Sequence, residues 1–557
     1  EFGVKAEVGY GNFGALNGKV SLDTGEIGGA VKATVSYSHR QRDGFVDNIL
    51  EPDDSKDPGS RESDSFRAAI RVEPTDSGYF QYIFDWTKIT GNPGPFQLTN
   101  TANGAVRAPI TVGGILITQT QQAPVQQFLA NATFANPACA ALAAPTREYR
   151  DTICLNSDEP STDKMWGHNF QAYNDFDSFA VKFTAGYRQW ENKYANNDLD
   201  GLGAFSGPLF TQGSVFNDFA GTPAAAFLPF VFPAGTPQST IDFVAGLAVP
   251  TANADLFASG NDRRHKQFST ELEVSGSTDL FDWVVGGFYF WEKGSEDNAQ
   301  NSGFVLDTNA AVFSRFGALS PIFQAANTAQ GNQYRLVVTP ARLTYTAQAQ
   351  STAIYAQTTI YPTGAEGPLS LTLGGRYTWD EKSIVRQQNG AAPLVNLESG
   401  DANFSKFTWN AMARYAFSDD ASIYLRAATG YRSGGFNAGD PTLAGTTTVP
   451  AFNEESVTSY EVGLKTEFFD NRLRLNIAAY HNIYEDLAVT TPVLVGGGTF
   501  QTRIVNAGKV KYYGIEADFL LSLTDNFYVD GSAGYVDVQF KEFNAGQPVN
   551  PADPIAN

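Results

Sequence analysis

Apolar and polar side chains alternate with a period of two over much of this chain. In Leu369–Asp380 one parity carries Leu, Gly, Tyr and Trp, and the other carries Ser, Thr, Arg and Asp. Successive side chains of a strand point to opposite faces, so the pattern predicts a strand with one apolar and one polar face. The alternation recurs in Val31–Arg40, Phe66–Glu73, Phe179–Arg188, Phe268–Val274, Ser405–Phe417, Tyr460–Phe468 and Leu473–Tyr484. We therefore expect an all-β protein.

A soluble sandwich or a propeller would also show this alternation. Two features favour a membrane barrel. The apolar face of a segment often ends in aromatic residues, as at Tyr377/Trp379 and Tyr415/Phe417. Membrane barrels carry aromatic girdles at both interfaces. The segments also run about 9–11 residues or longer, which is the span that a tilted strand needs to cross a bilayer.

The connections between these segments alternate between short and long. The short ones are rich in turn-forming residues and comprise Asp23–Gly29, Glu73–Gly78, Asn174–Ser178, Ser277–Asp282, Pro362–Pro368, Ser418–Ala421, Phe469–Arg472 and Thr524–Asn526. The long ones are 41–64, 88–166, 190–264, 293–341, 381–404, 433–455 and 487–501. Outer-membrane barrels have short periplasmic turns and long extracellular loops. The sequence therefore predicts an antiparallel transmembrane β-barrel with about seventeen strands.

An odd number of strands is unusual, because single-chain bacterial barrels use even numbers. The first and last of seventeen strands would run the same way, and ordinary antiparallel closure would fail. We therefore interpret residues 1–557 as a barrel domain from which C-terminal strands are missing.

Composition narrows the possible functions. The 557 residues carry a net charge of −21, with 17% charged and 13% aromatic residues. An acidic chain is a poor partner for nucleic acid, which is bound by clustered Lys and Arg. No stretch reaches the roughly 18 consecutive apolar residues of a transmembrane helix. Phosphate-binding loops, dinucleotide fingerprints and nucleophile elbows are also absent from the sequence, so we expect no enzyme.

Several motifs resemble those of TonB-dependent outer-membrane receptors, in the branch similar to siderophore receptors. The strongest is Gly430–Asn437 (GYRSGGFN), and the order and spacing of the motifs that follow it also match the family. These motifs are Glu454–Val457, Ser459–Lys465, Asn471–Asn476, Val505–Gly508 and Gly514–Glu516. Near the N-terminus, Val8–Phe13 and Tyr37–Phe45 resemble the opening of the family's barrel. The resemblance spans essentially the whole chain and is strong over 404–540.

The resemblance implies a barrel of about 22 strands that is occluded by an N-terminal plug. It implies a place in the bacterial outer membrane and uptake driven by the TonB–ExbB–ExbD complex acting through the plug. We expect the plug and about five C-terminal strands to be absent from residues 1–557. The expected substrate is a ferric siderophore, with cobalamin, a saccharide or an aromatic compound as alternatives. A passive porin or a structural or adhesin barrel is the competing class. Outer-membrane lipid and lipopolysaccharide are further expected partners.

Five polar residues are candidates for ligand binding because their parity and position place them on the inner face near the outer mouth. They are Arg376, Asp380, Arg432, Tyr484 and Asp486. A ring of Arg, Tyr and Asp could hold an anionic or catechol-bearing chelate. Contacts with the plug, or with one another across the lumen, explain them equally well. Gly434 and Gly435 of the GYRSGGFN motif are expected to let the chain turn from the strand into its loop.

The two cysteines, Cys139 and Cys154, lie in one long connection with fourteen residues between them. Thiols oxidise outside the cytoplasm, so a disulfide within the loop is expected. The four histidines have no paired spacing, and no metal site or cofactor is predicted. Eight acidic residues within 43–64 are interpreted as a solvated face, with weak divalent-cation binding that bridges to lipopolysaccharide as a minority hypothesis.

Overall fold

The computed structural model describes most of the chain. The described residues are 2–92, 94, 96–100, 110–112, 115–130, 132–156, 160–198, 200–206, 210–211, 253–307, 309–310, 333–388, 397–440, 442, 445–495 and 499–543.

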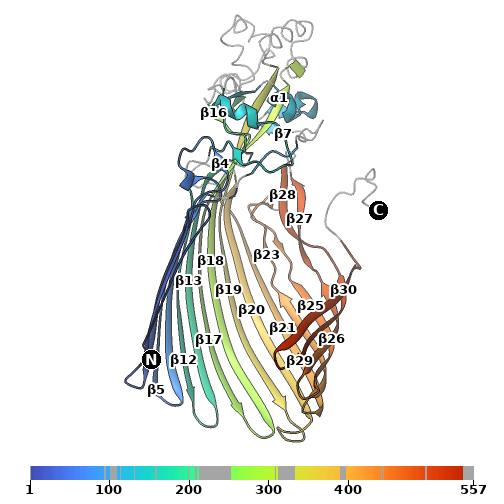
Figure 1. Cartoon of the computed structure of the whole chain (residues 1–557). Helices are drawn as coiled ribbons and strands as arrows, with labels where there is room; N and C mark the ends of the chain where they lie inside the picture. Colours follow the sequence, from blue (N-terminus) through green and yellow to red (C-terminus); the bar gives the residue numbers. More distant parts are fainter. Residues whose placement is uncertain are drawn as a thin grey trace, which may run out of the picture.

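Seventeen antiparallel strands form one continuous ladder (Figure 1), which confirms the predicted fold class and strand number. In ladder order they are β1 (Gly3–Gly11), β2 (Ala15–Ile27), β3 (Val31–Arg42), β5 (Arg61–Thr75), β6 (Gly78–Gly91), β12 (Ser161–Asp175), β13 (Ala180–Asp198), β17 (Phe257–Ser277), β18 (Phe281–Asp307), β19 (Tyr334–Ile360), β20 (Leu369–Gln388), β21 (Glu398–Ser418), β22 (Ala421–Arg432), β25 (Glu455–Phe468), β26 (Leu473–Glu485), β29 (Val510–Thr524) and β30 (Phe527–Phe540). Two short strands, β9 (Gln122–Ala123) and β15 (Phe210–Thr211), join the same sheet at its outer end.

The short turns gather at one end of the strands and the long connections at the other (Figure 1). Several strands continue well beyond the predicted limits. The predicted loop 293–341 is largely a hairpin, because β18 and β19 stay in register as far as Asp307 and Tyr334. The alternation is lost there, since residues such as Glu296, Asp297 and Asn298 place polar groups on both faces of the ribbon. A period-two pattern could not reveal this extension.

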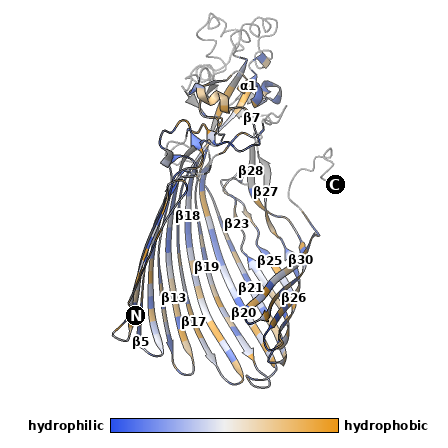
Figure 2. Cartoon of the chain, in the orientation of Figure 1, coloured by the Kyte–Doolittle hydropathy of each residue, from blue (hydrophilic) through white to orange (hydrophobic). Residues whose placement is uncertain are grey.

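One face of the sheet is apolar and aromatic. Tyr377 and Trp379 on β20 and Phe407 and Trp409 on β21 all expose more than a third of their surface. Figure 2 shows hydrophobic residues distributed along the strands between the turns and the opposite end. An exposed apolar face on a sheet of this size is what a bilayer covers.

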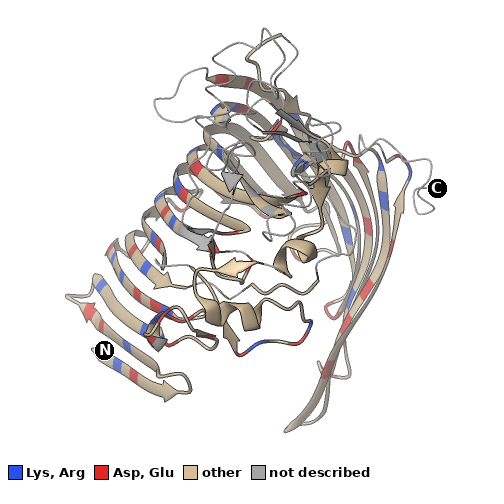
Figure 3. Ribbon diagram, turned by 90° about the horizontal axis from the view of Figure 1, so that it is seen from above, with Lys and Arg blue, Asp and Glu red and all other residues tan. Residues whose placement is uncertain are grey.

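The sheet is open between its first and last strands. Among the described residues, β1 pairs with β2 alone and β30 with β29 alone. Seen from above, the strands form an arc around a central space, with the two ends of the ladder on opposite sides of the opening (Figure 3). This arrangement agrees with the odd number of strands, because β1 and β30 run in the same direction.

Above the outer end, the long connections between β6 and β12 and between β13 and β17 fold into a layer that we call the crown (residues 118–156, 200–206 and 253–256). Its small elements are η2 (Gln119–Gln121), α1 (Val125–Leu129), β10 (Thr133–Phe134), η3 (Pro137–Leu142), β11 (Thr152–Ile153), β14 (Phe205–Ser206) and β16 (Asn253–Ala254). Beside it lie η1 (Asp54–Lys56), the strand β4 (Asp47–Asn48), which pairs with β11, and the hairpin β7 (Ile110–Val112) and β8 (Ile115–Ile117).

The crown has its own hydrophobic core. The ring of Phe205 packs against those of Phe128 and Phe134, at centroid distances of 5.1 and 4.9 Å. Cys139 and Cys154 form a disulfide with a Cα–Cα distance of 5.7 Å, and both residues are buried in this core. The predicted disulfide is therefore confirmed, and it joins two separate parts of the connection between β6 and β12. Among the described residues, no helix combines the length and apolarity that a membrane crossing needs.

Candidate ligand-binding mouth

The inner face of β20 carries a polar row towards the outer end. Arg376, Thr378 and Asp380 share one parity, so their side chains point to the same side of the sheet. Arg376 Nε donates to Thr378 Oγ1 at 3.1 Å. The Arg376 guanidinium carbon also lies 5.2 Å from the ring centroid of Phe288 and 5.7 Å from that of Tyr355. Arg376 thus presents a cation against aromatic faces on the wall of the lumen.

Asp380 is buried, and its carboxylate is hydrogen-bonded to a residue of β22, two strands away in the sheet. The hydroxyl of Tyr431, near the end of β22, donates a hydrogen bond to Asp380 Oδ2. The paired register of β21 and β22 ends at Asn410 and Ala428, and the next contact runs from Trp409 N to Thr429 Oγ1 at 2.9 Å. β22 therefore leaves β21 above Ala428, which allows Tyr431 to reach β20.

Arg432 forms an ion pair, with its Nε 3.0 Å from Glu455 Oε1. Glu455 Oε2 accepts a hydrogen bond from the backbone N–H of Ala488 at 2.6 Å. Ala488 begins the β27 hairpin, in which β27 (Ala488–Val495) pairs with β28 (Thr499–Asn506). Arg432 retains a largely exposed side chain, so its guanidinium is available to a ligand at this height.

Tyr484 and Asp486 lie at the end of β26, further round the mouth. The ring of Tyr484 packs edge-on against Tyr512, with centroids 5.3 Å apart. Asp486 adopts a left-handed backbone conformation, with φ of 53°, and its carbonyl accepts from Asn506 Nδ2 at 2.8 Å. Tyr484 is also paired with Val457 on β25 and with Val510 on β29. The structure thus does not gather the five candidates into one cluster: Asp380 and Arg432 lie near the same lysine, Lys382, whereas Tyr484 and Asp486 make their contacts further round the mouth.

Sequence reasoning missed Lys382, which lies two residues beyond Asp380 on the same inner parity. Its side chain is half-buried, and its ammonium group interacts electrostatically with Asp380, Glu292 and Arg432. Nearby, Lys406 Nζ is 2.8 Å from Glu454 Oε1. Lys382 continues the alternation of β20 on the inner face, and this alternation could have identified it. The predicted strand ended at Asp380 and therefore left Lys382 out.

The GYRSGGFN motif has a structural role at this mouth. Arg386 is 1% exposed, and its Nε donates to Glu398 Oε2 at 2.8 Å. Its two terminal nitrogens donate to the carbonyls of Asn437, Ala438 and Asp440, so the segment after the motif is tied to β20. A side chain at Gly434 would collide with the carbonyl oxygen of Phe452. Close backbone approach explains Gly434, and a Cβ at Gly435, which begins β23 (Gly435–Phe436) opposite β24 (Ala451–Phe452), would lie 3.2 Å from the Phe452 ring.

A pair of carboxyl groups is buried in and beside the crown. Asp200 Oδ1 accepts from Leu202 N at 2.9 Å, and Asp200 Oδ2 accepts from Phe257 N at 2.8 Å. Asp198 Oδ1 accepts from the backbone N–H groups of Asp200 and Gly201. Burial, together with the adjacent charge of Asp198, raises the pKa of the Asp200 carboxyl well above its ordinary value.

Comparison with known proteins identifies relatives of the chain. The family model described as "TonB dependent receptor-like, beta-barrel" matches residues 118–556. The ferric-pyoverdine receptor PbuA of a Pseudomonas species is 26% identical over 176 residues, which are 31% of this chain and 20% of that protein.

Solved structures share the fold at low sequence identity. The ferric yersiniabactin uptake receptor FyuA of Yersinia pestis aligns with a TM-score of 0.58 and 14% identity, covering 97% of this chain and 61% of that one. The siderophore receptor PiuA of Acinetobacter baumannii aligns with a TM-score of 0.54 and 14% identity, covering 98% and 64%. The chain therefore spans somewhat less than two thirds of the length of these receptors.

Proposed function

Since the chain belongs to the family of TonB-dependent receptor β-barrels, we propose that it takes part in the uptake of a ferric siderophore across the bacterial outer membrane. The family is one of outer-membrane transport receptors rather than of enzymes. The TonB–ExbB–ExbD complex is the proposed energy source, acting through a plug that occupies the lumen.

The observation that carries the proposal is the pairing of cations with aromatic rings on the inner face at the mouth. Arg376 lies against the rings of Phe288 and Tyr355, and Lys382 lies six residues further along β20 on the same face. Ferric chelates built on catecholate, phenolate or carboxylate groups carry negative charge and flat conjugated rings. Guanidinium and ammonium groups bind such oxygens through charge-assisted hydrogen bonds, and aromatic faces stack on the rings.

A binding experiment tests the substrate class. The full receptor in detergent would be titrated with ferric catecholate, hydroxamate and phenolate chelates, using quenching of tryptophan fluorescence. We expect one chelate class to bind, and R376Q and K382Q each to weaken binding by about tenfold, which corresponds to about 1.4 kcal/mol. The matched control is K88Q on the outer face, which should not change affinity. Equal affinity in all variants would remove these residues from the site.

Growth assays distinguish active uptake from a passive pore and from a structural or adhesin barrel. Cells that depend on the receptor for iron should stop growing on the bound ferric chelate when TonB is deleted. Persistent growth without TonB, with swelling of receptor-loaded liposomes in sugar solutions, would indicate a passive pore. Expression and growth that follow cobalamin, a saccharide or an aromatic compound would instead assign the substrate to that compound. A receptor whose loss affects growth on none of these nutrients would be a structural or adhesin barrel.

The outer face carries a second feature, which supports contact with lipopolysaccharide. On four strands an aromatic residue is followed, two positions nearer the outer end on the same face, by a lysine. The pairs are Trp86/Lys88 on β6, Trp166/Lys164 on β12, Phe268/Lys266 on β17 and Trp291/Lys293 on β18.

These lysines stand directly opposite one another, as Lys88 with Lys164 and Lys266 with Lys293. Like charges in cross-strand positions are unfavourable, and phosphate groups of the outer leaflet would relieve the repulsion. We expect the K88E/K164E variant to lose copurifying lipopolysaccharide relative to wild type, whereas K5E on β1 should not. Equal retention by both variants would contradict the proposed contact.

A further inference from the structure

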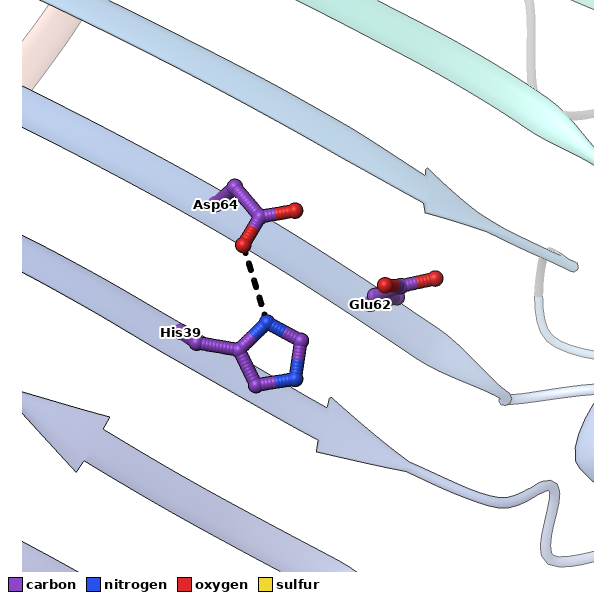
Figure 4. A group of neighbouring side chains, drawn as sticks. All are labelled: His39, Glu62 and Asp64. Carbon is purple, nitrogen blue, oxygen red and sulfur yellow. Dashed lines mark hydrogen bonds and ion pairs between the residues drawn. The ribbon is translucent and has the colours of Figure 1, made fainter.

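On the outer face of β3 and β5, one histidine and two carboxylates converge near the outer ends of the strands. His39, Glu62 and Asp64 each offer one ligand atom, and these atoms all lie within 4.8 Å of one another. Figure 4 shows His39 and Asp64 pointing towards one another from neighbouring strands, with Glu62 further along β5. The rungs that hold them are His39–Asp64 and Gln41–Glu62.

The hydrogen bonds of His39 define which ring nitrogen is free to bind a cation. Nδ1 lies 2.9 Å from Asp64 Oδ1, so the proton on this nitrogen points at the carboxylate. Asp64 Oδ1 also accepts from the Tyr37 hydroxyl at 2.6 Å. A carboxylate that receives Nδ1–H fixes the tautomer and leaves the Nε2 lone pair outward, which is the usual arrangement behind a metal-bound imidazole.

The Nε2 atom faces oxygen as well, because Gln41 Oε1 lies 3.2 Å away. An imidazole whose Nδ1 donates to a carboxylate leaves Nε2 to accept an amide N–H, to take a second proton or to bind a cation, and the Gln41 amide can turn its oxygen towards a cation held there. Glu62 occupies the same rung as Gln41. The amide and the carboxylate thus occupy the next positions beyond His39 and Asp64 on the same face of β3 and β5.

The surroundings favour a cation at this position. The neighbouring strands at the same height present lysines, and Lys88 is paired directly with Asp64. The outer face of β3 and β5 instead presents the carboxylates of Glu62 and Asp64 to the headgroup layer of the outer leaflet. The phosphates of that layer are also negative. A divalent ion would offset this repulsion, whereas Lys88 supplies a single charge to one of the two carboxylates.

We propose that His39, Glu62 and Asp64, with the Gln41 amide oxygen, form a binding site for a divalent first-row transition-metal ion. His39 Nε2 and Glu62 are the direct ligands, and Asp64 orients the imidazole through Nδ1. The mixed nitrogen and oxygen donor set suits Zn²⁺ better than Ca²⁺ or Mg²⁺, which prefer oxygen ligands alone. The site joins β3 to β5 on the lipid-facing side and is independent of the lumen.

Titration of the full receptor with Zn²⁺ alone tests this site. Chelator-treated protein in detergent would be titrated by calorimetry, with Co²⁺ absorption as a second readout. We expect one saturable site per chain, weakened at least about tenfold in H39Q and E62Q and by about 10–100-fold in D64N. The matched control is H265Q, which removes a histidine that has a single carboxylate partner, Glu292, at 3.1 Å. H265Q should bind Zn²⁺ as the wild type does.

A variant that should bind Zn²⁺ more tightly completes the test, because misfolding cannot explain a gain in affinity. Q41E adds a carboxylate beside Nε2 and should tighten Zn²⁺ binding by about tenfold, because a charged ligand replaces a neutral one. Absence of saturable Zn²⁺ binding would overturn the proposal, as would unchanged affinity in H39Q or in Q41E. Stronger binding of Ca²⁺ than of Zn²⁺ would show that the imidazole is no ligand and would equally overturn it.

Discussion

The hydroxyl of Tyr431 donates a hydrogen bond to Oδ2 of Asp380, and this bond links β22 to β20 across the strand that separates them. Asp380 is only 8% exposed, so its carboxylate has lost most of its water. The end of β22 remains paired with β25 as far as Arg432, but towards β21 and β20 it is held by this side-chain contact rather than by the backbone ladder.

The Y431F variant tests the strength of this contact. Removal of the hydroxyl leaves a buried acceptor without its donor, which costs about 1–3 kcal/mol. We expect the free energy of unfolding in urea to fall by this amount in detergent micelles. The control is Y377F on the outer face, whose hydroxyl lies 3.4 Å from Ser405 Oγ and which should stay within about 0.5 kcal/mol of wild type. Equal effects of the two variants would contradict a special role for Tyr431.

Arg386 is the second fixed point of the mouth. Its buried guanidinium pairs with Glu398 and donates to carbonyls of the segment 437–440. The R386M variant leaves these acceptors without a donor, and breaking a buried ion pair costs about 3–5 kcal/mol. Hydrogen exchange should show faster exchange in 433–440 and little change in β1 to β6. The control, R414M, removes an arginine that donates to Ser422 Oγ at 3.2 Å, and it should leave the exchange of 433–440 unchanged.

The crown disulfide yields a third prediction. Cys139 and Cys154 are separated by 15 positions, and closing a loop of this size contributes about 3 kcal/mol in the chain-entropy model. We expect the C139S/C154S variant to be cut by protease within the crown while the strands below remain intact. Wild-type protein treated with a reductant should behave in the same way. A crown that resists protease in both cases would show that its phenylalanine core is sufficient without the bond.

The transmembrane part of the fold was predictable because the bilayer imposes a pattern on the sequence. Leu369–Asp380 alternates strictly, since one face of β20 meets lipid and the other meets water. Beyond the bilayer both faces meet water, and β18 and β19 continue for many residues without such a signal. The crown was not predictable for a related reason: its core is assembled from two connections, with Phe128 and Phe134 in one and Phe205 in the other.

The candidate site was predictable only in part. Parity placed Arg376 and Asp380 on the inner face, and β20 carries both there. Parity could not show that β22 leaves β21 above Ala428, and hence that Asp380 is bonded to Tyr431, which has the opposite parity to Arg432. Side-chain direction beyond a break in the ladder depends on tertiary contacts, which no local pattern records.

Asp200 predicts how the crown responds to pH. Its pKa is raised from an ordinary value of 3.8 by burial and by Asp198, so the folded crown binds this proton more tightly than the unfolded chain does. The resulting stability is fully present below pH 3.8 and is lost as the pH rises through the folded pKa. Asp198 is the charged group that faces Asp200, and the other contacts of the carboxylate are the backbone N–H groups of Leu202 and Phe257.

Comparison with the D200N variant isolates this effect, because other titrating groups cancel in the difference. The stability of the wild-type crown relative to D200N should increase as the pH is lowered from about 8 to about 5. Hydrogen exchange within residues 200–206 at each pH, corrected for the intrinsic exchange rate, measures that difference. A difference that is constant across the range would show that Asp200 does not change protonation there. A difference that shrinks at low pH would mean that Asp200 is stabilised as the anion, with its two backbone donors outweighing burial and Asp198.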